Sequence, residues 1–392
     1  MLPRRPLLLS AMLALNASGL GASPQAGDDP GAFLQTQRAD VVCADLDGDG
    51  WDELVQTEAG SRGQSLTVRS LGPLGCALAH SEPVGPAQLL GAGRASGATE
   101  LLLARGCALE VWRAQDSALS KATEWVLPGP PVAATAGAFR RGKGREIAVA
   151  CAEAGGAQNH ESVFLLGDSG EGGLMGRPLT GLSLRHMAAC DADGDGQAEL
   201  ACVVCQRAKL DPVRRLRVHL YQFRPDRGGW WPFWQGSSLS RPFRAVRFAR
   251  SRAGLTSGDR LVSLERSSVP DEAGRDWLVV YRWNGFGFSV EWQALLGGAA
   301  TELFVRDLQG DGVDELAVVF ARAGERRAIC FERRGAAYAI RDRGIIGQAT
   351  DKVMAVYSAG EEYGLVLAGQ QPRLWVLGRA KPAGESAPKG DD

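Results

Sequence analysis

The chain has 392 residues, enough for two or three ordinary domains or for one large repetitive domain. Its 44 Lys and Arg residues nearly balance 45 Asp and Glu residues, which leaves a net charge of −1. This balance provides no basic surface for gripping nucleic-acid backbones, so we expect no nucleic-acid partner. Glycine accounts for 51 residues, roughly twice its usual share of about 7%. The sequence therefore predicts a globular protein with many tight turns.

The N-terminus has the order of segments that is typical of a secretory signal peptide. Arg4 and Arg5 precede an apolar stretch that ends at Leu15, and small residues follow up to Ala22. The apolar stretch is shorter than the roughly 18 residues needed to span a bilayer. We expect residues 1–22 to be a cleaved signal peptide, with an uncleaved anchor as the alternative. The mature chain is then expected to have no membrane span and to be secreted, periplasmic or exposed on the cell surface.

Eight cysteines would then enter an oxidising compartment, where disulfides form. Cys202 and Cys205 lie three apart in an apolar, strand-like run, so we expect them on opposite sides of a sheet rather than as a metal or redox pair. Cys190 and Cys202 occupy the two arms of one predicted hairpin and are the better disulfide candidates. The spacing alone leaves the pairing open.

Three acidic segments follow one pattern and are each flanked by short apolar runs: Asp45–Glu53, Asp191–Glu199 and Asp307–Glu315. The run at 41–43 before the first segment and the run at 316–320 after the third are both strand-like. Each acidic segment therefore predicts the loop of a β-hairpin. Four weaker copies of the hairpin include residues 100–104, 146–150, 257–262 and 360–366. They bring the number of units to seven.

An alternating strand follows each hairpin, and several units continue to a further strand that carries a tryptophan, as at Trp125, Trp234 and Trp292. Four short strands in roughly 50 residues are typical of a propeller blade, which buries both faces against its neighbours. We predict an all-β, seven-bladed β-propeller of four-stranded antiparallel blades over residues 31–378. Six and eight blades are the alternative counts, because the unit at 241–298 is weak. Residues 379–392 predict a disordered tail. The alternating strands are expected at 66–71, 108–113, 162–166, 217–223, 277–283, 327–332 and 373–377.

The acidic loops have the oxygen-rich pattern that binds calcium. Carboxylates at positions 1, 3 and 5 converge as the chain curls, glycine at position 6 permits the bend, and a carboxylate at position 9 closes the shell. Without a cation these carboxylates would repel one another. The alternative to a calcium site is a plain turn that binds no metal, and it would have to hold for three loops in the same register. The expected ligands are Asp45, Asp47, Asp49, the Trp51 carbonyl and Glu53 in the first loop, and Asp191, Asp193, Asp195, the Gln197 carbonyl and Glu199 in the second.

The third loop departs from this pattern, because Gln309 stands where the others have aspartate. We expect it to bind calcium more weakly, through Asp307, Gln309, Asp311, the Val313 carbonyl and Glu315. The sequence thus predicts two strong calcium sites and one weaker site.

The hairpin that ends at Glu146 has basic residues where the calcium loops are acidic: Arg140, Arg141, Lys143 and Arg145. We expect one of these side chains to neutralise Glu146 in place of an ion.

The Asp-x-Asp-Gly-Asp-Gly-x-x-Glu loops resemble those of FG-GAP/VCBS repeats, the calcium-binding blades of the integrin α-subunit head and of many secreted bacterial proteins. The resemblance implies a calcium-stabilised β-propeller of extracellular type. Such propellers serve as adhesion or binding modules, as lectins, or as scaffolds in polysaccharide-degrading enzymes. The resemblance therefore does not identify the ligand.

No group of residues predicts a catalytic site. The chain has four histidines, and none is grouped with cysteines or carboxylates at metal-ligand spacing. We expect a non-catalytic binding, adhesion or scaffold module for a protein or a glycan, with a polysaccharide lyase or a lectin as alternatives. For a lectin, Trp230 and Trp231 are the expected exposed residues, whereas Trp234 is expected to pack within an outer strand.

Overall fold

A computed structural model describes residues 41–379 except for gaps at 47–51, 61–62, 73–74, 96–97, 116–117, 154–159, 168–172, 209–210, 237–240, 251–257, 268, 270–271, 310, 349–352, 360–361 and 368–372. The regular structure of these residues is β-strand, apart from a short 3-10 turn, η2, at Pro225–Arg227. No helix in the described part of the chain has the length and apolar character to cross a membrane. The predicted signal peptide at 1–22 and the residues after Arg379 lie outside the described residues.

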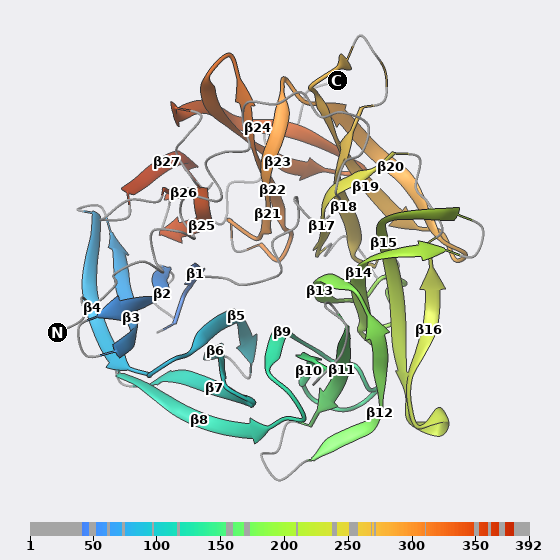
Figure 1. Ribbon diagram of the computed structural model, residues 1–392. Helices are drawn as coiled ribbons and strands as arrows, with labels where there is room; N and C mark the ends of the chain where they lie inside the picture. The colour runs from blue at the N-terminus through green and yellow to red at the C-terminus, as the bar shows by residue number, and fades with distance from the viewer. Residues whose placement is uncertain are drawn as a thin grey trace, which may run out of the picture.

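Antiparallel sheets stand side by side around a common centre and form a ring, which identifies the fold as a β-propeller (Figure 1). Within each sheet consecutive strands pair, and the first strand lies nearest the centre. The first sheet contains β1 (Val41–Ala44), β2 (Glu53–Gly60), β3 (Gly63–Gly72) and β4 (Gly75–Pro83). The second contains β5 (Gln88–Ala95), β6 (Ala98–Arg105), β7 (Ala108–Gln115) and β8 (Ala118–Val126).

The third meander contains β9 (Pro131–Gly137), β10 (Glu146–Ala152), β11 (Glu161–Leu166) and β12 (Leu174–Leu182). The fourth contains β13 (Leu184–Cys190), β14 (Glu199–Ala208), β15 (Asp211–Arg224) and β16 (Gly229–Gln235). Next come β17 (Phe243–Ala249), β18 (Arg260–Arg266), β19 (Asp276–Trp283) and β20 (Phe288–Leu295). They are followed by β21 (Ala299–Arg306), β22 (Glu315–Arg322), β23 (Glu325–Arg334) and β24 (Ala337–Gln348). The last sheet has three described strands, β25 (Val353–Ala359), β26 (Glu362–Leu367) and β27 (Arg373–Arg379).

The meanders β9–β12 and β13–β16 are joined into one eight-stranded sheet by their outermost strands. The junction is a single parallel pair, Arg177 with Gly229. Gly229 has a φ of 156°, and a Cβ at this position would lie 2.7 Å from the Arg177 carbonyl oxygen. Glycine therefore permits the close approach of the two outer strands. Every other neighbouring pair in this sheet is antiparallel.

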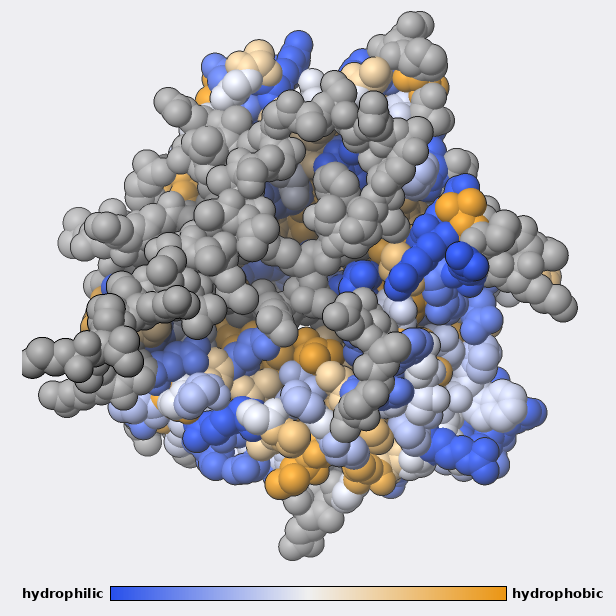
Figure 2. Space-filling model, in the orientation of Figure 1, coloured by the Kyte–Doolittle hydropathy of each residue, from blue (hydrophilic) through white to orange (hydrophobic). Residues whose placement is uncertain are grey.

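The hydrophobic core lies between neighbouring sheets rather than inside any one of them. Middle strands such as β10 are buried along nearly their whole length, because both of their faces contact another sheet, whereas the outer strand β12 is mostly exposed. This difference explains why the middle strands read as continuous apolar runs. One cluster joins Leu54 and Leu71 of the first sheet to Tyr357 and Val366 of the last, so packing closes the ring. On the face shown in Figure 2, hydrophilic and apolar side chains of the described residues are interspersed.

The structure confirms the strands expected from the sequence. The seven alternating segments all fall within the third strands of the meanders. Trp125, Trp234 and Trp292 lie on the fourth strands β8, β16 and β20. The weak unit at 241–298 forms a complete four-stranded sheet, β17–β20.

Candidate metal centre

The three acidic loops connect the first and second strands of their sheets, as predicted, and they share one hydrogen bond. In each loop the backbone amide of the second residue donates to Oε2 of the glutamate at the ninth position. This bond holds the glutamate against the inner side of the loop and shows that the three loops have the same register. The donor–acceptor pairs are Leu46–Glu53 at 2.8 Å, Ala192–Glu199 at 2.9 Å and Leu308–Glu315 at 2.7 Å.

The second loop is described in full, and its three aspartates converge. Carboxylate oxygens of Asp191, Asp193 and Asp195 all lie within 4.8 Å of one another. The amides of Gly194 and Gly196 donate to the Asp191 carboxylate at 2.8 and 3.0 Å. Both glycines have left-handed φ values, 78° and 83°, which residues with a Cβ rarely adopt. The glycines therefore let the loop curl around Asp191 and bring the carboxylates together.

Glu199 closes this loop, and no arginine or lysine in the described part of the chain forms an ion pair with it. Its side chain is fully buried, and Oε1 has no hydrogen-bond partner among the described residues. The pKa of Glu199 is raised to about 8, chiefly by burial; the Ala192 amide opposes this increase, and the nearby charges of Asp193, Asp191 and Asp195 add to it. A buried carboxylate of this kind is costly unless a cation or a proton compensates it.

Gln197, at the seventh position, is fixed by its side chain. Its Nε2 donates to the backbone carbonyls of Phe139 at 2.8 Å and Phe223 at 3.3 Å. Its own amide donates to Oδ1 of Asp195 at 2.8 Å. These bonds hold the loop against two neighbouring strand ends. Ligation through the Gln197 carbonyl stays a prediction.

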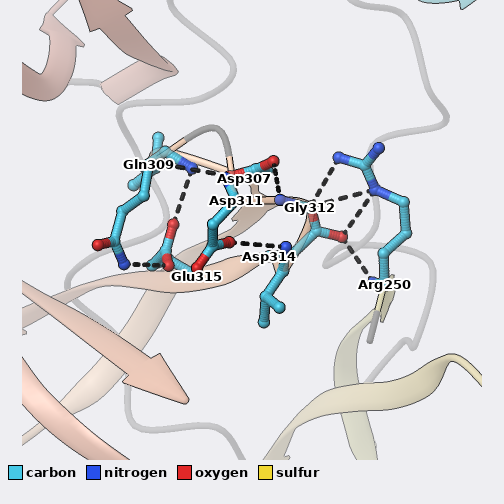
Figure 3. A network of polar contacts seen from close by, with 9 residues as sticks. Arg250, Asp307, Gln309, Asp311, Gly312, Asp314 and Glu315 are labelled. Atoms are coloured by element: carbon cyan, nitrogen blue, oxygen red, sulfur yellow. Dashed lines mark hydrogen bonds and ion pairs between the residues drawn. The ribbon is translucent and has the colours of Figure 1, made fainter. Parts of the chain in front are cut away.

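The third loop compensates its buried glutamate with a protein side chain (Figure 3). Nε2 of Gln309 donates to Oε1 of Glu315 at 2.6 Å, which occupies the oxygen that is free in Glu199. Burial raises the pKa of Glu315 to about 7, and the Gln309 hydrogen bond opposes this increase. The carboxylate of Asp307 accepts amide bonds from Asp311 and Gly312, as Asp191 does in the second loop.

The first loop is described in part. Asp45 and Glu53 lie at its two ends, while Asp47, Asp49 and Trp51 fall outside the described residues. The Asp45 carbonyl accepts a hydrogen bond from the Thr99 hydroxyl of the next sheet at 2.5 Å.

The loops that lack the acidic pattern neutralise their glutamates with arginine. Arg140 pairs with Oε1 of Glu146, which confirms the prediction that a basic side chain neutralises this glutamate, although Oε2 has no hydrogen-bond partner among the described residues. Glu100, at the equivalent position of the preceding sheet, pairs with Arg113 and Arg145. Both of these glutamates are buried, so the arginine beside each offsets the cost of burying its charge.

The basic loop also contacts the acidic one. Nη2 of Arg141 lies 2.9 Å from Oδ2 of Asp195, and the arginine side chain is largely exposed. Exposed ion pairs are weak and exchange with solvent ions. Arg141 therefore leaves Asp195 accessible to a cation.

In three sheets an aspartate stands directly before the second strand, and its structural role was not predicted from the sequence. The Asp259 amide donates to the Asp191 carbonyl at 2.6 Å, and the Asp191 amide returns a bond to Oδ2 of Asp259 at 2.9 Å. Asp314 forms the same reciprocal pair with Arg250. Each of these aspartates thus fastens its sheet to the loop start of the preceding sheet. The signal was present in the sequence, because Asp52, Asp259 and Asp314 all precede the closing position.

The described residues of the second loop fit a calcium ion. Three carboxylates converge, a fourth has an oxygen without a hydrogen-bond partner, and backbone amides stabilise the loop alongside one exposed ion pair, Arg141 with Asp195. Calcium prefers such a set of hard, flexible oxygen ligands. No other group of three or more His, Cys, Asp and Glu side chains in the described chain is close enough to hold a metal.

The tryptophan-rich strand differs from the expectation for a sugar-binding surface. Trp230 is buried and packs edge-on against Phe139 and Phe223, so its predicted exposure is wrong. It opens β16, where its side chain turns into the core between two sheets. Trp231 is 40% exposed, but the Arg227 guanidinium lies over its ring, 4.6 Å from the centroid. Trp234 packs against Trp283 and Phe288, as expected.

Of the two cysteine predictions, one is confirmed and the other is wrong. Cys202 and Cys205 belong to different core clusters, which confirms that they face opposite sides of β14. Cys190 lies in the cluster of Cys205, on the other side of the sheet from Cys202. The proposed Cys190–Cys202 disulfide is therefore wrong, and both thiols are free. Cys190 is opposite Glu199 in the strand register, and Cys202 is opposite Met187.

Comparisons with known proteins identify the fold and no family. No family model and no curated protein matches the chain. Among solved structures, the β-propeller domain of Cps50 (Swd1) from Myceliophthora thermophila matches with 10% identity and a TM-score of 0.52, over 88% of this chain and 99% of that one. Sqt1 from Saccharomyces cerevisiae matches with 10% identity and a TM-score of 0.51, over 88% and 98%. At such low identity these similarities show a β-propeller and nothing about ligand or activity.

Proposed function

We propose that this chain is a secreted, calcium-stabilised propeller of the FG-GAP/VCBS type that acts as a non-catalytic binding module. The observation that carries the proposal is the contrast between Glu199 and its equivalents. Glu100 and Glu146 are each paired with arginine, whereas no arginine or lysine among the described residues pairs with Glu199, which lies buried beside three converging aspartates. A divalent cation supplies the missing charge.

The proposed blade count is seven. The sheets β9–β12 and β13–β16 meet through one parallel pair at their outer edges, so we treat them as two blades rather than one. Both have four strands in meander order, like the complete sheets around them. The three-stranded sheet β25–β27 is the seventh blade.

The calcium sites are expected to differ in strength. The second loop has the free Glu199 oxygen and three aspartates, so it is the strong site. In the third loop a cation must displace the Gln309 amide from Glu315, which costs a hydrogen bond and lowers the affinity. The first loop has the same ligand types as the second, and we propose a second strong site there. At extracellular calcium concentrations even weak sites are filled.

Protein is the favoured partner over glycan. The paired tryptophans that would stack on sugar rings are not both exposed, since Trp230 belongs to the core and an arginine covers one face of Trp231. No group of described residues favours a polysaccharide lyase over this non-catalytic role. We therefore propose that a face of the ring presents loops to another extracellular protein.

Calorimetric titration of the metal-free protein tests the calcium proposal. We expect saturable binding of calcium, and much weaker binding of magnesium, which prefers a rigid octahedral shell and retains its waters. The double variant Asp193→Asn and Asp195→Asn is expected to lose the tightest binding event. Asp226→Asn, which alters an exposed aspartate in the η2 turn, serves as the matched control. Equal calcium binding by the wild type and the double variant would refute the assignment of this loop.

A further inference from the structure

The inner strands line a second candidate site, which differs from the acidic loops because its charged residues are arginines. A cavity of about 230 Å³ lies at the centre of the ring, among the first strands of four sheets. Its volume is below that of pockets for drug-sized molecules and suits a small ligand. The strands that line it are β1, β17, β21 and β25, with two arginines in the wall: Arg247 and Arg306.

The two arginines differ in their partners. Arg306 pairs with Asp52, and its Nη1 donates to the backbone carbonyls of Cys43 and Val356 at 2.9 and 3.2 Å. Nη1 of Arg247 donates a hydrogen bond to the adjacent Val246 carbonyl at 2.9 Å. Within the described chain no carboxylate forms an ion pair with Arg247.

Two other arginines of the same sheet, unlike Arg247, are paired with carboxylates. Arg244 lies 2.9 Å from Asp276, and Arg260 lies 2.7 Å from Glu291. Burial lowers the pKa of Arg247 to about 10, with no acidic group opposing the shift, and a guanidinium remains charged at that value. His186 lies on the neighbouring strand β13. Burial and the Arg247 charge hold the pKa of this histidine below its ordinary value, so it stays neutral and supplies no negative charge to Arg247.

Part of the wall is apolar. Val41, Leu303, Val305 and Ala355 contribute aliphatic surface around the guanidinium. A planar guanidinium fork binds a carboxylate through two parallel hydrogen bonds, and a partly desolvated charge gains most from such a partner. The cavity thus combines one unpaired cation with space for a short hydrocarbon chain.

We propose that this axial cavity binds a small organic carboxylate, with its carboxylate on Arg247 and its short apolar part against Leu303 and Ala355. The lining of this cavity includes none of the proposed calcium ligands. The proposed carboxylate site is therefore tested with calcium present throughout, so that its failure leaves the calcium proposal untouched.

Thermal unfolding with butyrate, butyramide or sulfate at equal concentrations tests the ligand class. We expect butyrate to raise the Tm by about 2 °C at roughly ten times its dissociation constant. Butyramide keeps the shape but loses the charge, so it is expected to have little effect. A shift with sulfate as large as that with butyrate would overturn the organic carboxylate in favour of an inorganic anion, and a shift with butyramide as large would remove the role of charge.

Variants assign the effect to one side chain. In Arg247→Gln we expect butyrate affinity, measured by calorimetry, to fall at least tenfold. Arg282→Gln, an exposed arginine on β19 of the same sheet, is the matched control and is expected to bind butyrate like the wild type. Equal binding by Arg247→Gln and the wild type would overturn the proposal. Should Arg247→Gln fail to fold, Arg247→Lys keeps the charge but loses the fork, and undiminished affinity in that variant would count against the site.

Discussion

Asp52 and Ser358 fasten the two ends of the ring to each other by a reciprocal pair of hydrogen bonds. The Asp52 amide donates to the Ser358 carbonyl at 2.8 Å, and the Ser358 amide donates to Oδ2 of Asp52 at 2.5 Å. The same arrangement joins Asp259 to Asp191 and Asp314 to Arg250. At Asp52 it closes the propeller, because β2 belongs to the first sheet and β25 to the last. Arg306 adds an ion pair to the other Asp52 oxygen.

Removing this closure is expected to destabilise the whole protein. Asp52 is 2% exposed, and Asp52→Ala would remove the acceptor of the Ser358 amide and the ion-pair partner of Arg306. Losing one partner of a buried pair costs about 3 kcal/mol, which we expect as the fall in the free energy of unfolding. Urea unfolding of the purified variant, at constant calcium, measures it.

The control is a pair on the surface. Glu325→Ala removes the partner of Arg327, where both side chains are substantially exposed, and is expected to cost less than about 1 kcal/mol. If Asp52→Ala were no more destabilised than Glu325→Ala, the closure by Asp52 would be energetically unimportant.

The third loop offers a gain of metal dependence. In Gln309→Asp a carboxylate replaces the amide that satisfies Glu315, so the loop acquires the acidic pattern of the second loop. Without calcium we expect a loss of about 1–3 kcal/mol, because Oε1 of Glu315 loses its donor and faces a new negative charge. With calcium the loss is expected to be reversed.

Differential scanning fluorimetry in EDTA and in calcium measures this change. Gln309→Ala removes the same hydrogen bond without adding a ligand, so its melting temperature is expected to be low in both conditions. A Gln309→Asp variant that responds to calcium no more than Gln309→Ala would argue against metal binding in this loop.

Two buried histidines are expected to make the protein sensitive to acid. Burial lowers the pKa of His219 to about 4, helped by the charge of Arg217, and burial also lowers the pKa of His186. A histidine whose folded pKa lies below its unfolded value near 6.5 stabilises the fold fully above that value. This contribution is lost as the pH falls from about 6.5 towards 4.

The variant His219→Gln isolates the contribution of His219. Between pH 7 and pH 4 the wild type should lose on the order of 2 kcal/mol more unfolding free energy than this variant. Urea unfolding at several pH values measures the difference, which cancels the carboxylates common to both proteins. His160→Gln, at an exposed position, is the control. Parallel pH profiles for the wild type and His219→Gln would contradict the prediction.

The fold was predictable because the strands and the turns recur in the same order. Middle strands such as 146–152 read as apolar runs, and the loops with Asp and Gly mark the hairpins between them. The packing of sheet against sheet follows from those runs, since a strand that is apolar on both faces must be covered on both. Even the pairing of Glu146 with Arg140 was visible as a basic loop in an acidic position.

Other features depended on three-dimensional packing and had no local signal. The burial of Trp230 depends on Phe139, which lies in the β9–β10 loop of the neighbouring meander, and the opposite orientation of Cys190 and Cys202 depends on the strand register. The cavity beside Arg247 is formed by inner strands that are distant in the sequence. Contacts of this kind are not encoded in the pattern of any one segment.

Trp230 and Trp231 are adjacent in the sequence but are expected to respond very differently to substitution. Trp230→Ala removes a ring that fills the space between Phe139 and Phe223, so we expect a loss of about 3–5 kcal/mol in the free energy of unfolding. Trp231→Ala removes a partly exposed ring and its contact with Arg227, and is expected to cost about 1 kcal/mol or less. Chemical unfolding distinguishes the two.

Because Trp231→Ala is expected to keep the fold, a glycan array with this variant also tests the lectin alternative. Glycan binding by the wild type that disappears in Trp231→Ala would favour a lectin over the protein-binding module proposed above.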